Sequence, residues 1–206
     1  MKRPGKVARY KIQRRLGTEL PGLGKAGALE RRPYPPGENG NKRKKYSDFA
    51  LRLEEKQKLR FHYGLKEEQL RRFIRDSKRG SGSNWVNKLV GRLETRLDNI
   101  VFRLGFASSI RAARQLISHG HVLVDDKKLD ISSCVITAGQ TIKIREKAKE
   151  NQIVLQAMQS PRLDVPEFLL KETEYSGTLQ AVPGMDAIPF SFDSGLFTEY
   201  YAARKV

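Results

Sequence analysis

The sequence predicts an α+β protein with a basic, extended N-terminal arm, a mostly helical domain, and a small domain of two helices on an antiparallel sheet. Two changes of pattern predict it. Gly and Pro are frequent in the first part of the chain, where apolar periodicity is almost absent. Further on, apolar residues recur at helical spacing and then, after Gly120, at every second position, as in strands. We therefore expect four segments, namely residues 1–45, 46–93, 94–158 and 159–206.

The arm, residues 1–45, carries 14 basic and three acidic side chains, a net charge of +11. A segment with so little apolar surface cannot offset the entropy of ordering with a core of its own. It is either a disordered solubilising tail or a basic arm that folds only against a polyanion. The alternation of Lys and Arg with Gly favours the second interpretation.

The second segment has the pattern of two amphipathic helices. Ser47 is expected to cap a helix that continues to about Tyr63, where Gly64 ends it. Residues 66–76 predict a second, shorter helix. Residues 77–83, which are rich in Ser and Gly, predict a linker.

After the linker, two helices precede a set of short strands. We expect a long helix from Asn84 to Leu104, capped by Ser83, and a second helix from Ile110 to His119, capped by Ser108 or Ser109. Residues 121–124 predict a strand and residues 125–128 a turn. Further strands are expected at residues 129–131, 134–136 and 141–144, and residues 160–188 are expected to form an extended surface segment.

The net charge of +17 indicates the class of partner. Each Lys or Arg that neutralises a phosphate releases a condensed counterion, so a charge of this size favours a nucleic acid. A membrane is also anionic, but no apolar run approaches the ~20 residues needed to span one, and we see no secretory or lipidation signal. Residues 160–206 have a net charge of −3 and are expected to have a different role.

The two helices of the small domain predict one electropositive surface. Each has an apolar face and a polar stripe at helical spacing, and the Arg side chains of these stripes suit phosphate oxygens. The alternative is a pair of solvated faces with ion pairs to Glu94 and Asp98. The stripe of the first helix contains Arg92, Arg96, Asn99 and Arg103, and that of the second contains Arg111, Arg114, Gln115 and Ser118.

Other basic residues extend the predicted RNA contacts. Lys42 to Lys45 form a basic quartet that fits a phosphate clamp. His119 and His121 flank Gly120 and are expected to cap the helix and touch the nucleic acid backbone; as a metal site they are too few. The remaining expected contacts are Lys11, Arg14, Arg15, Lys42, Arg43, Lys44, Lys45, Lys56, Lys58, Lys127 and Lys128.

We expect neither catalysis nor a cofactor. The sequence contains no phosphate loop, nucleophile elbow or dinucleotide fingerprint. Gly91 to Glu94 comes near the G-R-L-D motif of pseudouridine synthases, but Glu94 replaces the catalytic Asp. Cys134 is the only cysteine, which excludes an internal disulfide, and we expect it to be a small apolar residue in a strand within a reducing compartment.

Six stretches of the sequence resemble a known family. Residues 96–124 resemble the small RNA-binding domain of ribosomal protein four, several pseudouridine synthases and bacterial tyrosyl-tRNA synthetases. Residues 11–17, 53–65 and 145–149 are similar to ribosomal protein four in particular. Pro35-Pro36-Gly37 and Asn39-Gly40 resemble its P-P-G-x-H-G turn, with Asn39 in place of His. Leu20 to Leu23 looks most like chloroplast and cyanobacterial members.

This resemblance implies a structural constituent of the small ribosomal subunit. Family members bind rRNA early, nucleate assembly of the 5′ domain, line the channel through which mRNA enters beside ribosomal proteins three and five, and affect translational accuracy. Some bind zinc through four cysteines in the arm; here the arm has none, so we expect no zinc. By motif, Arg96, Arg103, Arg114, Gln115 and His119 would contact RNA.

The resemblance also implies a place for the acidic C-terminal segment and a compartment. Residues 190–201 would pack on the N-terminal helices and on a neighbouring protein. The expected location is the ribosome of a chloroplast stroma or a cyanobacterial cytoplasm. Two alternatives stay open at this point, namely an RNA-modifying enzyme and a ribosome-associated stress or rescue factor that uses the same small domain.

Overall fold

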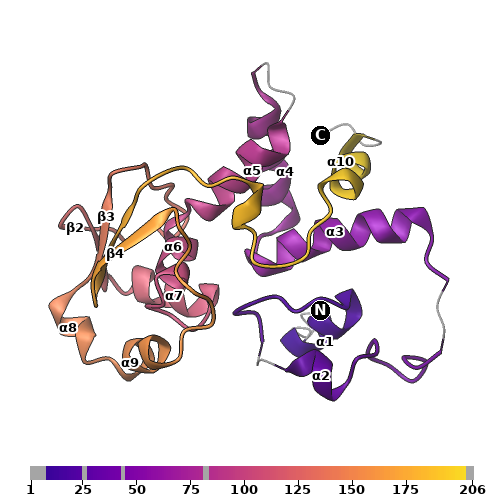
Figure 1. The fold of residues 1–206 in the computed structure, drawn as a ribbon, viewed down its shortest axis with the longest axis horizontal. Coiled ribbons are helices and arrows are strands. Elements are labelled where there is room, and N and C mark those ends of the chain that lie inside the picture. Colours follow the sequence, from indigo (N-terminus) through magenta and orange to yellow (C-terminus); the bar gives the residue numbers. More distant parts are fainter. Residues whose placement is uncertain (1–7, 25–26, 43–44, 81–83, 203–206) are drawn as a thin grey trace, which may run out of the picture. The chain divides into compact units, whose positions relative to one another are not determined.

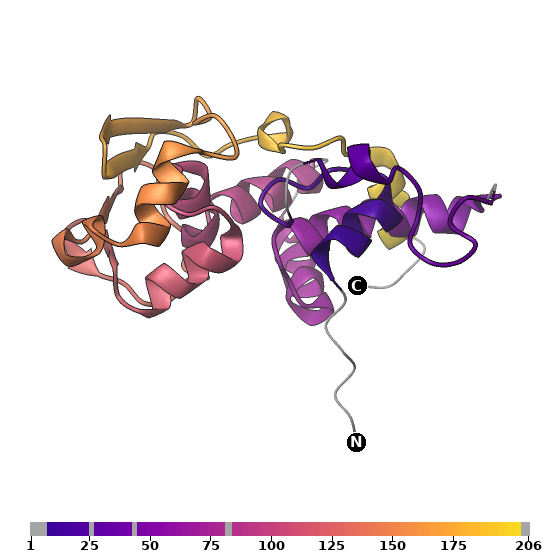
Figure 2. The same cartoon turned by 90° about the horizontal axis from the view of Figure 1, so that it is seen from below.

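The computed structural model describes residues 8–24, 27–42, 45–80 and 84–202 (Figures 1 and 2). Its contacts group the chain into two compact units. Unit 1 comprises the residues up to 66 together with those from 189 onward, and unit 2 comprises residues 67–188. Within the described residues, no helix combines the length and apolar character required to cross a membrane. The predicted α+β class is confirmed.

Helix α3 (Asp48–His62) is the longest element of unit 1, and its ends are those predicted. The Oγ atom of Ser47 accepts a hydrogen bond from the backbone N–H of Ala50 at 3.3 Å, which satisfies a donor of the first turn. Gly64 follows the helix with a φ of 58°. This left-handed conformation favours glycine and ends the helix.

The arm has a small apolar core, which contradicts the expectation that it lacks one. Helix α1 (Arg9–Leu16) is followed by a turn and by the short helix α2 (Ala28–Arg31). Phe61 of α3 and Phe190, which are distant from the arm in sequence, are partly buried and pack against this core. The buried residues of this cluster are Ile12, Leu16, Leu20 and Leu23.

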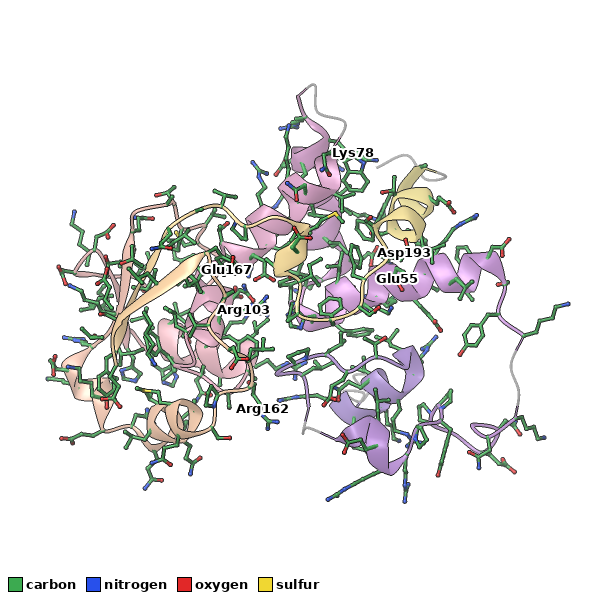
Figure 3. All side chains as sticks on the ribbon, viewed as in Figure 1. Glu55, Lys78, Arg103, Arg162, Glu167 and Asp193 are labelled. Atoms are coloured by element: carbon green, nitrogen blue, oxygen red, sulfur yellow. The ribbon has the colours of Figure 1, made fainter. Side chains whose placement is uncertain are left out.

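The C-terminal residues of unit 1 pack on α3. Helix α10 (Ser194–Ala202) lies beside α3, and Glu199 accepts a hydrogen bond from Arg52 at 2.7 Å. The buried Glu55 carboxylate accepts one from the backbone N–H of Asp193 at 3.0 Å (Figure 3). Lys58 donates both to Glu55 and to the carbonyl oxygen of Ser191. Charged residues of α3 therefore hold this segment.

Unit 2 begins with four helices that pack in consecutive pairs. Helix α4 packs on α5, and α6 packs on α7. The N-cap of α5 is Asn84, whose side chain accepts from the backbone N–H of Asn87; the predicted cap Ser83 lies outside the described residues. The N-cap of α7 is Ser109, as one of the two predicted alternatives. The four helices are α4 (Glu67–Lys78), α5 (Trp85–Glu94), α6 (Leu97–Arg103) and α7 (Ile110–Ser118).

The predicted single helix from Asn84 to Leu104 is wrong, because the helix is interrupted between α5 and α6. Arg96 is extended, with φ −68° and ψ 140°, and forms an isolated bridge with Val135. The backbone N–H of Leu97 donates to the carbonyl oxygen of Cys134 at 2.8 Å, and that of Ile136 donates to Thr95 at 2.8 Å. A segment almost forty residues later thus competes with the helix for its backbone groups, which periodicity within one helix cannot reveal.

A five-stranded antiparallel sheet completes unit 2, in the order β2-β1-β3-β5-β4. Residues 129–131 do not form a strand, and residues 134–136 contribute only the bridge to Arg96. Residues 160–188 are not merely an extended segment, because they contain the hairpin of β4 and β5, which pairs with β3. The strands are β1 (Val122–Val124), β2 (Lys127–Lys128), β3 (Thr141–Ile144), β4 (Leu169–Thr173) and β5 (Ser176–Leu179).

Three short helices lie in the connections of unit 2: α8 (Glu146–Lys149), α9 (Gln152–Gln159) and the 3₁₀ helix η1 (Met185–Ala187). The inner face of the sheet meets the end of α6. A Cβ atom built on Gly177 would lie 2.5 Å from Cδ2 of Leu104 and 3.1 Å from the carbonyl oxygen of Leu170. A side chain at this position of β5 would therefore force Leu104 to move within the core.

We predict that Gly177→Val destabilises unit 2 by about 1–3 kcal/mol, because the added methyl groups overpack the contact with Leu104. Urea unfolding followed by the fluorescence of Trp85, the only tryptophan, measures this change in unit 2. Leu170→Ala is the matched control, since Leu170 lies on the neighbouring strand but is 48% exposed. An unchanged midpoint for Gly177→Val would contradict this packing.

Candidate RNA-binding surface

The stripe predicted on the first helix is mostly internal. Arg96, Asn99 and Arg103 are 3%, 0% and 4% exposed, so the prediction that they form an open RNA-facing surface is contradicted. The break at Arg96 changes the direction of the chain, so a helical wheel drawn through Arg92 and Arg103 does not describe one surface. The ion pairs of the alternative interpretation are present, with Glu94 and Asp98 as acceptors, but they are buried instead of lying on solvated faces.

Glu94 is the centre of the first internal cluster. Its Oε2 atom accepts from Nε of Arg103 at 3.1 Å and from Nδ2 of Asn99 at 2.7 Å. Nη2 of Arg103 donates in addition to the carbonyl oxygen of Ala187, close to η1 (Figure 3 labels Arg103). The buried carboxylate therefore joins α5 to α6 and, through Arg103, to the segment after the sheet.

Asp98 is the centre of the second cluster. Its two carboxylate oxygens accept from Nε and Nη2 of Arg96 at 3.0 and 2.8 Å, a bidentate pair. One of them, Oδ2, also accepts from Nε of Arg114 at 2.7 Å. The side chain of Asp98 is 1% exposed and that of Arg96 4%, whereas that of Arg114 is 29% exposed. Arg114 thus has one end in this cluster and the rest at the surface of α7.

The outer face of α7 is the part of the predicted surface that the structure leaves open. Arg111, Gln115, Ser118 and His119 are all exposed along it, and Arg114 is half-buried at its side. Ser118 donates to the carbonyl oxygen of Gln115 at 3.1 Å. Arg92 of α5 is also exposed, with its Nη1 atom 3.8 Å from Asp76.

The turn between β1 and β2 brings further lysines to α7. Asp125 and Asp126 have φ values of 49° and 63°, the left-handed pair that a two-residue hairpin turn needs. Lys127 and Lys128 follow and are exposed, and the side chain of Lys128 passes over Gly120 at the end of α7. We use the name α7 surface for Arg111, Arg114, Gln115, Ser118, His119 and Lys128.

Hydrogen bonds fix the acidic side of this turn. The backbone N–H of Thr141 donates to Asp125 at 2.9 Å and the amide of Gln140 donates at 2.7 Å, and these bonds hold the pKa of Asp125 below its usual value. Asp126 accepts from Lys143 at 2.8 Å, which raises the pKa of Lys143. Both carboxylates are therefore engaged with the sheet next to Lys127 and Lys128.

Three of the contacts predicted in unit 1 are buried, which contradicts the expected exposure. Arg14 donates to the carbonyl oxygens of Tyr34 and Pro35 at 2.9 and 3.3 Å and so fastens the Pro-Pro-Gly turn to α1. Lys58 is paired with Glu55, and Nζ of Lys56 lies 5.2 Å from the centre of the Tyr200 ring. Exposed members of the predicted set are Lys11, Arg15, Lys42 and Lys45, and Arg43 and Lys44 lie outside the described residues.

No group of three or more His, Cys, Asp and Glu side chains that could hold a metal occurs in the described part of the chain. His119 and His121 lie with their ring centres 6.0 Å apart. Cys134 is partly exposed and follows a turn, so its predicted place inside a strand is wrong.

Comparison with known families defines the class of protein to which this fold and surface belong. Residues 95–142 match the S4 domain, and residues 6–94 match the ribosomal protein S4/S9 N-terminal domain. The two matches adjoin at the break between α5 and α6.

Three bacterial relatives align with nearly the whole chain. The small ribosomal subunit protein uS4B of Bdellovibrio bacteriovorus is 58% identical over 207 residues, which is 99% of this chain and 100% of that protein. The uS4 proteins of Geobacillus sp. and Rippkaea orientalis are 42% and 44% identical, over 94% and 95% of this chain and 96% of each relative. The chain belongs to the uS4 family of small ribosomal subunit proteins, which confirms the resemblance found in its motifs.

Sequence reasoning missed the roles of Glu94 and Asp98. The sequence suggested them only as partners for exposed arginines, yet they are the buried acceptors around which α5, α6 and α7 meet. The signal available was their spacing of four residues with Arg96 between them. That spacing indicates shared partners only once the helix break is known.

We predict that Arg103→Ala lowers the stability of unit 2 by about 3–5 kcal/mol, because it leaves the Glu94 carboxylate buried without its charged partner. Arg111→Ala removes the same charge from an exposed position of α7 and is expected to change stability by less than about 0.5 kcal/mol. Urea unfolding with Trp85 fluorescence measures both. Equal stabilities of the two variants would show that the Arg103 pair is not an internal support.

Proposed function

We propose that this chain is a structural, non-enzymatic component of the small ribosomal subunit and that it binds rRNA through the α7 surface. The observation that carries the proposal is the membership of the whole chain in the uS4 family, whose relatives are named as small ribosomal subunit proteins. The net charge of +17 and the exposure of the α7 surface support a polyanionic ligand.

The chemistry of the α7 surface suits RNA. Arg111 and Arg114 offer guanidinium groups to phosphate oxygens, and Gln115 and Ser118 lie beside them with groups that reach sugars or base edges. Lys128 and His119 extend this surface at the end of α7. Arg92 and Lys127 in unit 2, and Lys11, Arg15 and Lys42 to Lys45 in unit 1, complete the proposed contacts.

The finer role follows from the family. We propose a primary rRNA binder that nucleates assembly of the 5′ domain, lies at the channel through which mRNA enters, and affects translational accuracy. Its neighbours there would be ribosomal proteins three and five. Lys42 and Lys45 are exposed, which fits contact with mRNA phosphates at this channel.

A ribosome is the proposed location, and its compartment is a separate question. A chloroplast stroma or a cyanobacterial cytoplasm is supported by the cyanobacterial relative from Rippkaea orientalis, at 44% identity. The relative from Bdellovibrio bacteriovorus, at 58% identity, favours instead the cytoplasm of another bacterium. Of the two, the second has the stronger support.

The enzymatic alternative is disfavoured by the geometry of its carboxylates. Glu94, which stands where the pseudouridine synthase motif has its catalytic Asp, is 0% exposed, and Asp98, four residues further on, is 1% exposed; both are engaged by arginines. Neither can approach a substrate base without breaking these pairs. A stress or rescue factor would instead bind free large subunits and would be lost from small subunits in a high-salt wash.

The first test is a salt titration of the purified protein with a 5′-domain fragment of small-subunit rRNA and a length-matched unrelated RNA. We expect a preference of ~10³ or more for the rRNA fragment at physiological salt, as in specific recognition. Equal binding to both RNAs that is lost as salt rises would mean that the protein binds RNA only through non-specific electrostatic attraction.

A second test addresses the α7 surface. Arg111→Ala is expected to weaken binding by about 1–3 kcal/mol and to reduce the slope of log affinity against log salt by about one, because one phosphate contact is lost. Arg162→Ala is the matched control, since Arg162 is exposed in the acidic C-terminal part of the chain (Figure 3). If both variants bind alike, the RNA lies on another face.

A further inference from the structure

We infer that Asp98 is a positioning residue for RNA binding, because its buried carboxylate fixes the guanidinium group of Arg114 on the α7 surface. The inference rests on the proposed function, since it assumes that Arg114 meets RNA. It assigns to Asp98 and Arg96 an indirect role, in which neither residue contacts RNA. Asp98 holds Arg114, and Arg96 holds Asp98.

The geometry gives each of the three residues a separate place. Arg96 covers both oxygens of the carboxylate through Nε and Nη2, at 3.0 and 2.8 Å, and its guanidinium carbon lies 5.7 Å from the centre of the Phe73 ring. It is thus held between an acid and an aromatic ring inside the unit. Arg114 reaches the same carboxylate at 2.7 Å through Nε, at the root of its guanidinium group.

The exposed fractions show the direction of the cluster. They rise from 1% for the Asp98 side chain and 4% for that of Arg96 to 29% for that of Arg114. A hydrogen bond through Nε fixes the plane of a guanidinium group, whose remaining donors have a rigid fork geometry. Arg114 is therefore oriented by the interior while part of it stays open beside Arg111, Gln115 and Ser118.

Backbone hydrogen bonds fix the position of Asp98. The N–H of Asp98 donates to the carbonyl oxygen of Ser132 at 3.1 Å, and that of Leu97 donates to Cys134 at 2.8 Å. Hence the helix break that separates α5 from α6 also sets the position of the carboxylate. Two cations, Arg96 and Arg114, share this one acid, and the side chain of Arg114 continues from it to the surface of α7.

This arrangement reduces the loss of side-chain conformational entropy that accompanies RNA binding. A free arginine side chain loses many rotamers when it binds a phosphate, whereas a side chain already held at Nε loses fewer. A lysine at the same position would have the same charge but neither the fixed plane nor the Nε donor. Position, apart from charge, is thus what the network contributes.

The sign of the effect of Asp98→Asn separates positioning from simple electrostatics. Removing a negative charge near a polyanion should strengthen binding or leave it unchanged if only charge matters. If the carboxylate positions Arg114, the same change weakens binding. The charge-matched control is Asp126→Asn in the same unit, whose side chain is 74% exposed and pairs with Lys143.

The experiment measures the affinity of the full chain for the 5′-domain rRNA fragment across a salt titration, for Asp98→Asn, Arg114→Ala and the double variant. We expect Asp98→Asn and Arg114→Ala each to weaken binding about tenfold. The double variant should bind like Arg114→Ala within about twofold, because Asp98 acts through Arg114. Asp126→Asn should bind at least as tightly as the unchanged protein.

Three results would overturn the inference: tighter or unchanged binding by Asp98→Asn, a loss that persists in full when Arg114 is alanine, or a loss of equal size in Asp126→Asn. Trp85 fluorescence and circular dichroism check that each variant is folded. Where Asp98→Asn does not fold, Arg114→Lys decides. Its affinity should fall about fivefold or more at an unchanged salt slope, and wild-type affinity would refute positioning.

The same titration separates this inference from the function on which it rests. If the unchanged protein does not prefer the rRNA fragment over the unrelated RNA, the proposed function itself fails. If that preference is present and only the Asp98 variants behave as charge changes, the function stands and the positioning role is lost.

Discussion

The backbone bridge between residues 95–98 and residues 132–136 is the constraint on which the rest of unit 2 depends. It ends α5 at Glu94 and starts α6 at Leu97 by giving the backbone groups of this stretch partners outside any helix. A continuous helix would place Arg96 and Arg103 on a solvent-facing stripe. The break instead places them inside, each opposite a carboxylate.

In the interior, these ion pairs add little net stability, but loss of one partner destabilises the unit strongly. Buried pairs often do no better than apolar residues of the same size, because desolvation of both ions offsets their attraction, but losing one partner is costly. Glu94 with Arg103 and Asp98 with Arg96 therefore act mainly by making one arrangement of α5, α6 and α7 acceptable. Separating α5 from α6 would remove the hydrogen bonds that Asn99 and Arg103 donate to the Glu94 carboxylate.

Local signals were sufficient for elements whose ends are set by their own residues. Ser47 and Gly64 delimit α3, and Ser109 begins α7, as the sequence predicts. The outer face of α7 was predictable for the same reason, since helical periodicity assigns residues to the correct face of a helix that is not interrupted. The hairpin of β4 and β5 was not, because four of the five residues of β4 are exposed and show no alternation. The core of the arm was also missed, since Phe61 and Phe190 come from distant segments.

Composition alone overstates the surface that meets RNA. A net charge of +17 establishes that a polyanion is a fitting partner, but it does not say which cations face it. Several cations that the sequence assigns to RNA are occupied internally: Arg14 by backbone carbonyls, Lys58 by Glu55, and Arg96 by Asp98. The exposed cations of the predicted set lie on α7, on the β1–β2 turn and in the arm. A basic residue in such a protein therefore has to be checked for an internal acceptor before it is assigned to the nucleic acid. Arg114 has both an internal acceptor and an exposed surface, so the two roles can be combined in one side chain.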